Sequence, residues 1–112
     1  MYRDALVIEL RLARFEVRVE QHIPVYYRGH RIRDDLRIDI MVNGLIVVEV
    51  KAVDRLHPVH LAQVITYLKL AGAPVGILFN FKATSIRTGM RRLEHPDLYA
   101  KPGAGPQHPP LE

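Results

Sequence analysis

The sequence predicts an α/β fold in which a mixed sheet of four strands is flanked by helices. Apolar residues recur at helical spacing in residues 2–14 and 58–72, whereas four shorter runs are rich in β-branched and aromatic side chains. Three of these runs follow one another with short connections, which favours an antiparallel meander. The fourth run comes after the second helix, so a crossover is expected to join it to the sheet.

The first half of the chain is expected to form one helix and three strands. Residues 2–14 form an amphipathic helix that has no N-capping residue, as if its first turns were missing. Residues 15–28 alternate as a strand, and Pro24 indicates that this strand lies at an edge or is bulged there. Residues 29–35 are interpreted as a polar connection. Two further strands, 36–42 and 45–51, then flank the turn-forming pair Asn43-Gly44.

The second half supplies a helix, a buried strand and an ambiguous segment. Pro58 is suited to the first turn of a helix, and Gly72 to its C-terminal end. The apolar run 73–81 is typical of a buried strand. Residues 84–95 fit either a short helix or a final strand.

Length and composition indicate one domain with a short tail. The chain has 112 residues, of which we assign 1–95 to a single domain and 96–112 to a Pro- and Gly-rich tail that we expect to be disordered. Cysteine is absent, which excludes disulfides, thiolate metal sites and a cysteine nucleophile. No apolar run reaches the length of a membrane span and no signal peptide opens the chain, so a cytoplasmic protein without membrane contact is expected.

The charge balance weakly favours a polyanionic partner. The chain carries 16 Lys plus Arg against 12 Asp plus Glu, a formal net charge of +4. Twelve of the basic residues are arginine, whose planar guanidinium is suited to bidentate phosphate contacts. Nucleic acid is therefore one candidate partner, although many proteins carry a similar charge.

The two strands around Asn43-Gly44 contain three charged residues in otherwise apolar runs. An uncompensated charge inside a sheet is costly, so these residues require an explanation. Side chains alternate between the two faces of a strand, and matching the apolar faces places the three charges together. The first strand then divides into Leu36, Ile38 and Ile40 against Arg37, Asp39 and Met41, and the second into Ile46, Val48 and Val50 against Leu45, Val47, Glu49 and Lys51.

This arrangement requires a particular turn. A two-residue turn would put Asp39 on the wrong face, whereas a three-residue loop with Gly44 in the left-handed region pairs Met41 with Leu45. Asp39 would then face Val47, with Glu49 as its diagonal neighbour about 7–8 Å away between Cα atoms.

Two adjacent carboxylates are well suited to hold a hard divalent cation such as Mg²⁺, which prefers oxygen ligands. Such an ion acidifies its bound water and shields a phosphodiester, and Lys51 could orient that water or stabilise charge on phosphorus. The alternative is a buried ion pair of Lys51 with Asp39 or Glu49 that has no chemical role.

The second helix adds polar side chains on one face. His60, Gln63 and Tyr67 are spaced so that they project together, either toward the charged side of the sheet or along a solvated edge. His57 and His60 form only a weak candidate for a metal-binding pair.

Asp39, then Glu49-Val50-Lys51, then Gln63 to Tyr67 resembles the D…(D/E)xK…QxxxY signature of the PD-(D/E)XK nuclease superfamily. The QxxxY element is typical of its recombination-associated exonuclease branch. Over about residues 2–93 the sequence is most similar to the small bacterial GxxExxY family. This resemblance implies a mixed four-stranded sheet with a helix on either side.

The resemblance also implies roles for individual residues. Asp39 and Glu49 would ligate Mg²⁺ or Mn²⁺, the Val50 carbonyl could add a ligand, and Lys51 would be the catalytic lysine. The remaining two signature residues, Gln63 and Tyr67, would position the metal site or the nucleic-acid strand.

One part of the family pattern is not matched. Tyr2 aligns with the final tyrosine of GxxExxY, so the glycine and glutamate of that motif would fall before residue 1. In the superfamily a first-helix acid often completes the metal shell, and Glu9 lies two turns further on.

Three hypotheses follow for function. The first is a metal-dependent nuclease that hydrolyses phosphodiester bonds in DNA. The second, favoured by the unmatched first-helix acid, is an inactive nuclease-like module that binds nucleic acid or a protein partner. The third is a structural domain that forms a homodimer through the apolar stripe of the first helix and the Ile77-Leu78-Phe79 strand.

Overall fold

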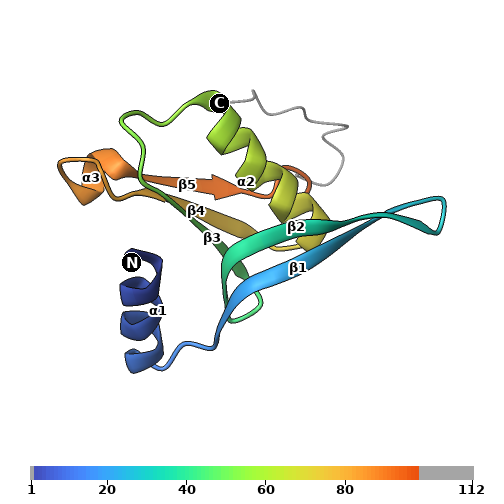
Figure 1. The fold of residues 1–112 in the computed structure, drawn as a ribbon, viewed down its shortest axis with the longest axis horizontal. Helices are drawn as coiled ribbons and strands as arrows, with labels where there is room; N and C mark the ends of the chain where they lie inside the picture. The colour runs from blue at the N-terminus through green and yellow to red at the C-terminus, as the bar shows by residue number, and fades with distance from the viewer. Residues whose placement is uncertain (1, 99–112) are drawn as a thin grey trace.

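A computed structural model describes residues 2–98 and contains a mixed sheet with helices on both faces (Figure 1). The predicted α/β class is therefore confirmed, but the sheet has five strands rather than four. The elements are α1 (Tyr2–Leu12), β1 (Val17–Tyr27), β2 (His30–Val42), β3 (Ile46–Lys51), α2 (Pro58–Ala71), β4 (Val75–Asn80), α3 (Ile86–Gly89) and β5 (Met90–Glu94).

The strands are ordered β1-β2-β3-β4-β5 across the sheet. All neighbouring pairs are antiparallel except β3 and β4, which are parallel and are joined through α2. This is the crossover that the element order predicts. The ambiguous segment 84–95 contains both expected elements, because Ser85 caps the single turn of α3 and β5 then pairs with β4.

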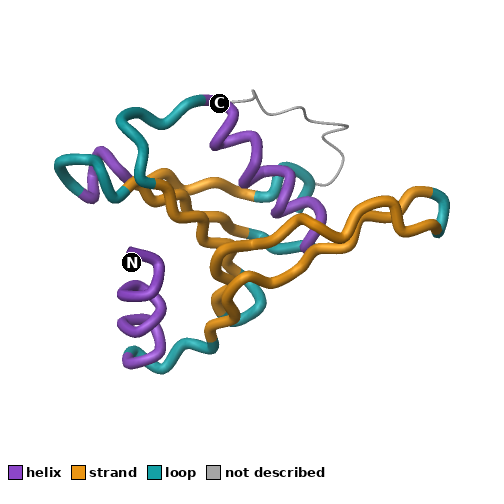
Figure 2. The backbone as a smooth tube through the Cα atoms, in the orientation of Figure 1, coloured by secondary structure: helices purple, strands orange, loops and turns teal. Residues whose placement is uncertain are grey.

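Each face of the sheet is covered by one helix (Figure 2). On one face, Val7 of α1 packs with a cluster that includes Val17 and Ile40. On the other face, α2 contributes Val64, Tyr67 and Leu68 to a second cluster. The predicted arrangement of a sheet between two helices is confirmed. We refer to the second face as the α2 face.

Helix α2 begins and ends where the sequence predicts. Pro58 occupies its first turn, where the missing N–H leaves no hydrogen bond unmade. Gly72 ends it with a φ of 67°, in the left-handed region that glycine adopts without strain. The Gly72 N–H donates to the Leu68 carbonyl and so closes the last turn.

Strands β1 and β2 continue beyond the rest of the sheet as a long two-stranded ribbon, at the right of Figure 1. The prediction of a polar connection at 29–35 is wrong, because His30–Asp35 belong to β2. Arg28 and Gly29 both have positive φ, 50° and 80°, as a type I′ turn requires, and Tyr27 pairs with His30. The Arg-Gly pair forms this turn although Asn-Gly and Asp-Gly are the more usual signals.

The ribbon is irregular near Pro24, as predicted. The pairing shifts between Ile23 and Val25, and it shifts again between Val25 and Tyr26. Strand β1 is also an edge strand of the sheet. An edge strand accepts proline because no partner requires its missing N–H.

Two expectations concern regions that the structure describes only in part. Of the predicted disordered tail 96–112, residues 99–112 lie outside the described residues, so the tail and the domain boundary at residue 95 stay predictions. Within residues 2–98, no helix is long and apolar enough to cross a membrane.

Candidate functional site

The loop between β2 and β3 differs from the predicted one in its register. As predicted, Gly44 is left-handed (φ 65°) and three residues separate the paired strands. However, Met41 pairs with Val47 rather than with Leu45. Asn43 is left-handed as well, and the Leu45 N–H donates to the Val42 carbonyl, so Leu45 is the residue left outside the ladder.

The start of β1 helps to fix this turn. The Asn43 N–H donates to the Glu16 carbonyl at 2.8 Å, and the Asn43 side-chain oxygen accepts from the Glu16 N–H at 2.9 Å. The resulting register ends with the pair of Ile40 and Val48, so Asp39 and Glu49 are the next residues along the two strands, and the Asp39 N–H donates to the Glu49 carboxyl group. The two carboxyl groups are therefore direct cross-strand neighbours and not the predicted diagonal ones.

The predicted alternation along β2 is also wrong at one point. Ile38 lies in the cluster beneath α2 and Ile40 in the cluster beneath α1, although two residues separate them. The break occurs at Asp39, between the Val19–Ile40 and Gln21–Ile38 pairs, where Glu20 on β1 has a φ of 50°. Beyond this point the ribbon turns its apolar side toward α2. The sequence pattern shows no proline or glycine at this break.

Asp39 and Glu49 are joined by hydrogen bonds to each other's strands. The Asp39 N–H donates to Glu49 Oε1 at 3.1 Å, and the Val50 N–H donates to Asp39 Oδ2 at 2.9 Å. These side-chain contacts continue the β2–β3 connection beyond the Ile40–Val48 pair. In an extended strand the N–H and C=O of one residue point to the same neighbour, so the Val50 carbonyl also points toward Asp39.

Glu49 is almost completely buried, with 2% of its surface exposed. The pKa of Glu49 is raised from 4.5 to about 8, first by burial and then by the nearby Asp39 carboxylate, whereas the Asp39 N–H and the charge of Lys51 oppose the shift. Without a bound cation, Glu49 therefore holds a proton at neutral pH. A site that raises a carboxyl pKa in this way favours a cation as the replacement for that proton.

Lys51 ends β3 on the same side, half-buried and close enough to influence both Glu49 and His60 electrostatically. The pKa of His60 is lowered by desolvation, then by the positive charges of Lys51 and His57. His60 Nδ1 accepts the His57 N–H at 3.0 Å, which caps the start of α2. This contact gives His60 a structural role that the sequence does not predict.

Gln63 and Tyr67 also face the carboxyl pair. Tyr67 is buried, and its hydroxyl accepts a hydrogen bond from Gln63 Nε2 at 3.1 Å. Burial raises the pKa of Tyr67, and Glu49 and Asp39 raise it as well, which places the hydroxyl in their electrostatic field. Of the two orientations that the sequence allows for this helix face, the structure has the one directed at the sheet.

Asn80 is a buried residue near the site that the sequence analysis does not identify. Its amide accepts from the Val53 N–H at 3.0 Å and donates to the Val53 carbonyl at 2.8 Å. The Phe81 N–H donates to the Lys51 carbonyl, so the end of β4 fixes the chain that leaves β3. A polar residue ending the apolar run 75–79 is the sequence signal that could have revealed it.

Glu9 does not lie near the carboxyl pair. It is exposed on α1, which covers the opposite face of the sheet. Glu9 is therefore no substitute for the first-helix acid of the family pattern.

A surface groove lies apart from these residues. It has a volume of about 450 Å³ and is lined by parts of β1, the Asn43-Gly44 turn and the end of α2. Gln21 lines it, and its Oε1 is the one buried side-chain atom within residues 2–98 that has no hydrogen-bond partner. Neither Asp39 nor Glu49 contributes to this groove, so we place the functional site at the carboxyl pair, where the ionisable groups converge.

The donor set fits a divalent cation that keeps several waters. In the part of the chain that the structure describes, no three His, Cys, Asp or Glu side chains are grouped as a metal site. Two carboxylates and the Val50 carbonyl therefore form the available set. Mg²⁺ is commonly held by one or two carboxylates, with water and substrate oxygens completing its octahedron.

Comparison with known proteins identifies the family of the chain. The PD-(D/E)XK nuclease superfamily matches residues 1–93, most of the chain. The chain belongs to this superfamily. No curated protein and no solved structure shows a significant match to the sequence.

Proposed function

We propose that this protein is a nuclease that hydrolyses phosphodiester bonds in DNA with Mg²⁺ or Mn²⁺, and that it is a member of the small bacterial GxxExxY family. The observation that carries the proposal is the buried pair of Asp39 and Glu49, directly opposite each other and bordered by Lys51. Membership of the superfamily supports it, because these nucleases are often metal-dependent.

Asp39, Glu49 and the Val50 carbonyl would hold the cation. When bound, the cation would lower the pKa of a coordinated water and neutralise charge on the phosphodiester. Its binding requires Glu49 to release its proton, which the raised pKa opposes at neutral pH. Affinity for the metal is therefore expected to rise with pH up to about 8.

The other residues would act on the substrate and the water. Lys51 would orient the attacking water and stabilise negative charge developing on the phosphoryl oxygens. Gln63 and Tyr67 are joined by a hydrogen bond and would position the metal ligands or the DNA strand as a unit. The Tyr67 hydroxyl, which accepts from Gln63, retains its own proton to donate.

Cleavage of labelled DNA in Mn²⁺ tests the proposal. The Glu49→Gln variant should lose at least about a hundredfold in rate, because the amide supplies no charge to the metal, and it should keep its fold. Thr66→Ala, on the exposed side of α2, is the control and should cleave like the unmodified chain. Equal cleavage by Glu49→Gln and by the unmodified chain would refute the assignment.

The alternative function is a catalytically inactive module that binds nucleic acid or a protein partner. One observation favours it. Within residues 2–98, the proposed metal ligands include two carboxylates, and no third acidic side chain is grouped with them. Calorimetric titration with Mn²⁺ separates the two functions without a substrate. Metal binding that disappears in Glu49→Gln supports the nuclease, whereas absence of binding in both proteins supports the inactive module.

A further inference from the structure

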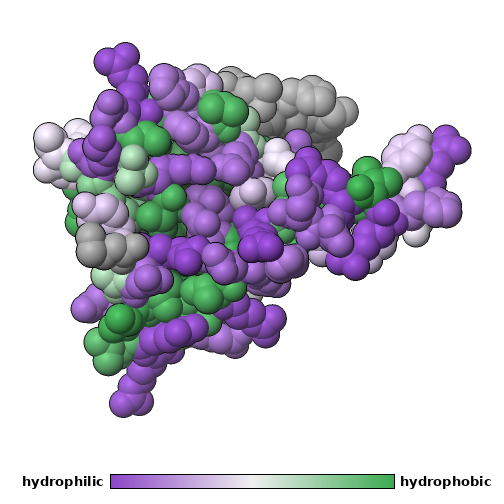
Figure 3. Space-filling view, in the orientation of Figure 1, coloured by the Kyte–Doolittle hydropathy of each residue, from purple (hydrophilic) through white to green (hydrophobic). Residues whose placement is uncertain are grey.

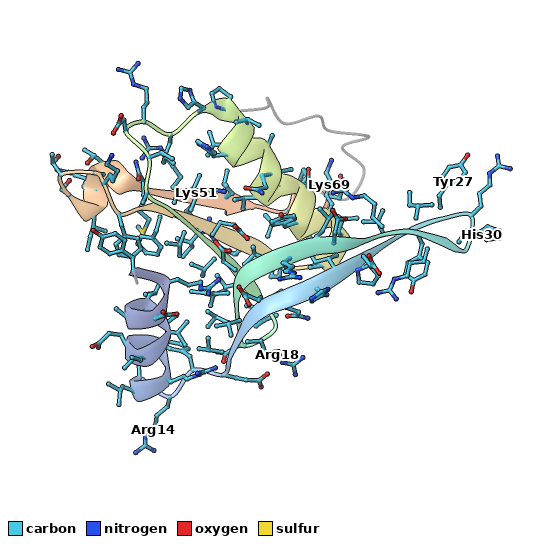
Figure 4. The ribbon with its side chains drawn as sticks, viewed as in Figure 1. Arg14, Arg18, Tyr27, His30, Lys51 and Lys69 are labelled. Carbon is cyan, nitrogen blue, oxygen red and sulfur yellow. The ribbon has the colours of Figure 1, made fainter. Side chains whose placement is uncertain are left out.

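The outer part of the β1–β2 ribbon has a composition unlike that of the rest of the surface. We call residues 24–33 the arm, which is formed by the end of β1, the Arg28-Gly29 turn and the start of β2. It extends away from both helices, and Tyr27 and His30 mark its tip in Figure 4. Within residues 2–98 no other element covers this tip, as Figure 1 shows.

The arm carries a net positive charge, which lies in residues 28–33. It contains three arginines and a histidine, and no acidic residue. Arg33 is paired with Asp35 at its base, whereas Arg28 and Arg31 form no ion pair with any described residue. Figure 3 shows this region as largely hydrophilic, in contrast to the apolar surface over α1. Arg28 and Arg31 can therefore accept an anionic partner without breaking an ion pair among the described residues.

Aromatic side chains stand beside these charges. Tyr26 and Tyr27 are 60% and 59% exposed, well above what packing in a core would leave. Tyr26 lies opposite Arg31 in the ladder, and the Arg28 guanidinium lies 5.6 Å from the centre of the Tyr27 ring. Exposed rings next to unpaired guanidinium groups are a combination suited to nucleic acid, with its anionic phosphates and planar bases.

Strand β2 links the arm to Asp39 of the carboxyl pair. Asp39 and Arg31 both belong to β2, and eight residues of extended chain span at most about 26 Å. At the base of the arm, Arg33 is close enough to Tyr67 to interact with it electrostatically. At 3.4 Å per base pair, the separation of Asp39 and Arg31 corresponds to at most about eight base pairs.

From these observations we propose that the arm binds duplex DNA by entering its major groove, with Arg28 and Arg31 on the phosphates beside the carboxyl site. A two-stranded β-ribbon fits the major groove of B-form DNA. The major groove of an RNA duplex is deep and narrow, which excludes a ribbon of this kind. This inference rests on the proposed function, because it assigns the substrate class of the same site.

Fluorescence anisotropy with a labelled 24-base-pair DNA duplex, in EDTA so that no cleavage occurs, tests the arm. The full chain is compared with Arg28→Gln/Arg31→Gln. Loss of two phosphate contacts should weaken binding by at least about tenfold and reduce the slope of log K against log salt by about two.

Arg14→Gln/Arg18→Gln is the matched control. It removes the same charge, and Arg14, like Arg28, has a positive φ. Both control residues are exposed and lie away from the arm tip in Figure 4. Their replacement should leave affinity within about twofold. An equal loss of DNA affinity in both double variants would overturn the proposed role of the arm and indicate a general charge effect.

Two further outcomes would overturn the proposal. One is equal affinity for a 24-base-pair RNA duplex, and the other is absence of DNA binding by the unmodified chain. Failure of the proposed function looks different. If the chain binds DNA through the arm but does not cleave it in Mn²⁺, the proposed role of the arm is supported and the proposed nuclease activity is refuted. If it cleaves DNA and the arm variant binds DNA normally, the proposed nuclease activity is supported and the proposed role of the arm is refuted.

Discussion

The surroundings of Glu49 disfavour the ionised form of its carboxyl group. Its side chain is 2% exposed, the Asp39 carboxylate is opposite, and Lys51 compensates only in part. The pKa of about 8 records this imbalance between burial and available positive charge. Functional sites commonly keep groups whose ionisation is costly until a ligand binds.

This pKa predicts how the stability of the metal-free protein depends on pH. Between pH 4.5 and 8 the folded chain holds a proton on Glu49 that the unfolded chain has released. The free energy of unfolding therefore falls as pH rises through this range. Glu49→Gln should remove that part of the slope and, at pH 8, be more stable by about 4 kcal/mol, which follows from the difference between the pKa values of 4.5 and about 8.

Urea unfolding in EDTA at pH 5 and pH 8 measures this difference. Lys69→Gln, on the exposed side of α2, serves as the control for a change of charge elsewhere. Identical pH slopes for Glu49→Gln and the unmodified chain would show that Glu49 ionises normally.

Among the elements, α2 and β4 make the closest packing contact that bears on the site. Gly76 lies on β4 beneath α2, and an added Cβ would lie 2.5 Å from Val64 Cγ1 and 3.3 Å from Leu68 Cδ2. Both neighbours are completely buried and cannot move aside without shifting the helix. Gln63 and Tyr67 belong to the same helix, so this contact fixes their height above the sheet.

Gly76→Ala is therefore expected to destabilise the protein by about 1–3 kcal/mol. It should also reduce DNA cleavage, because the added methyl group would displace α2 and so move Gln63 and Tyr67 away from the carboxyl pair. Thermal unfolding and the cleavage assay measure the two effects. A fully stable and fully active Gly76→Ala variant would contradict the tight contact between β4 and α2.

At the level of the whole molecule, binding of the cation should stabilise the fold. The proposed ligands come from two strands that unfolding would separate, so the unfolded chain would bind the metal only weakly. At a Mn²⁺ concentration one hundred times its Kd, the free energy of unfolding should rise by about 2.7 kcal/mol. Thermal unfolding with and without Mn²⁺ should show this increase at pH 8 and not in Glu49→Gln. An equal increase in both proteins would place the metal elsewhere.

Helix α1 presents an apolar surface to solvent. Ile8 and Leu12 are 58% and 72% exposed, on the face opposite the carboxyl pair. This is part of the surface on which the expected homodimer would form. The dimer stays a prediction, and its formation there would leave the arm and the proposed site uncovered.

Patterns in the sequence were enough to predict the class of fold and the proximity of Asp39 to Glu49. Helical and alternating periodicities predicted both main helices, the crossover to β4 and the presence of Asp39 and Glu49 on one side of the sheet. These features depend on interactions between neighbours in the sequence, which a pattern can record. The two carboxyl groups share a face in both the predicted and the observed register, because the two differ by an even number of positions.

The detailed arrangement of these residues depends on contacts between distant parts of the chain, which sequence patterns do not record. The pairing of Asp39 opposite Glu49 depends on the hydrogen bonds between Glu16 and Asn43, which are far apart in sequence. The positive φ of Glu20 accompanies the break in alternation that places Ile38 in the cluster beneath α2, a contact between distant parts of the chain. The raised pKa of Glu49 likewise follows from burial beneath α2, since the ionisation of a carboxyl depends on its surroundings and not on its neighbours in the chain.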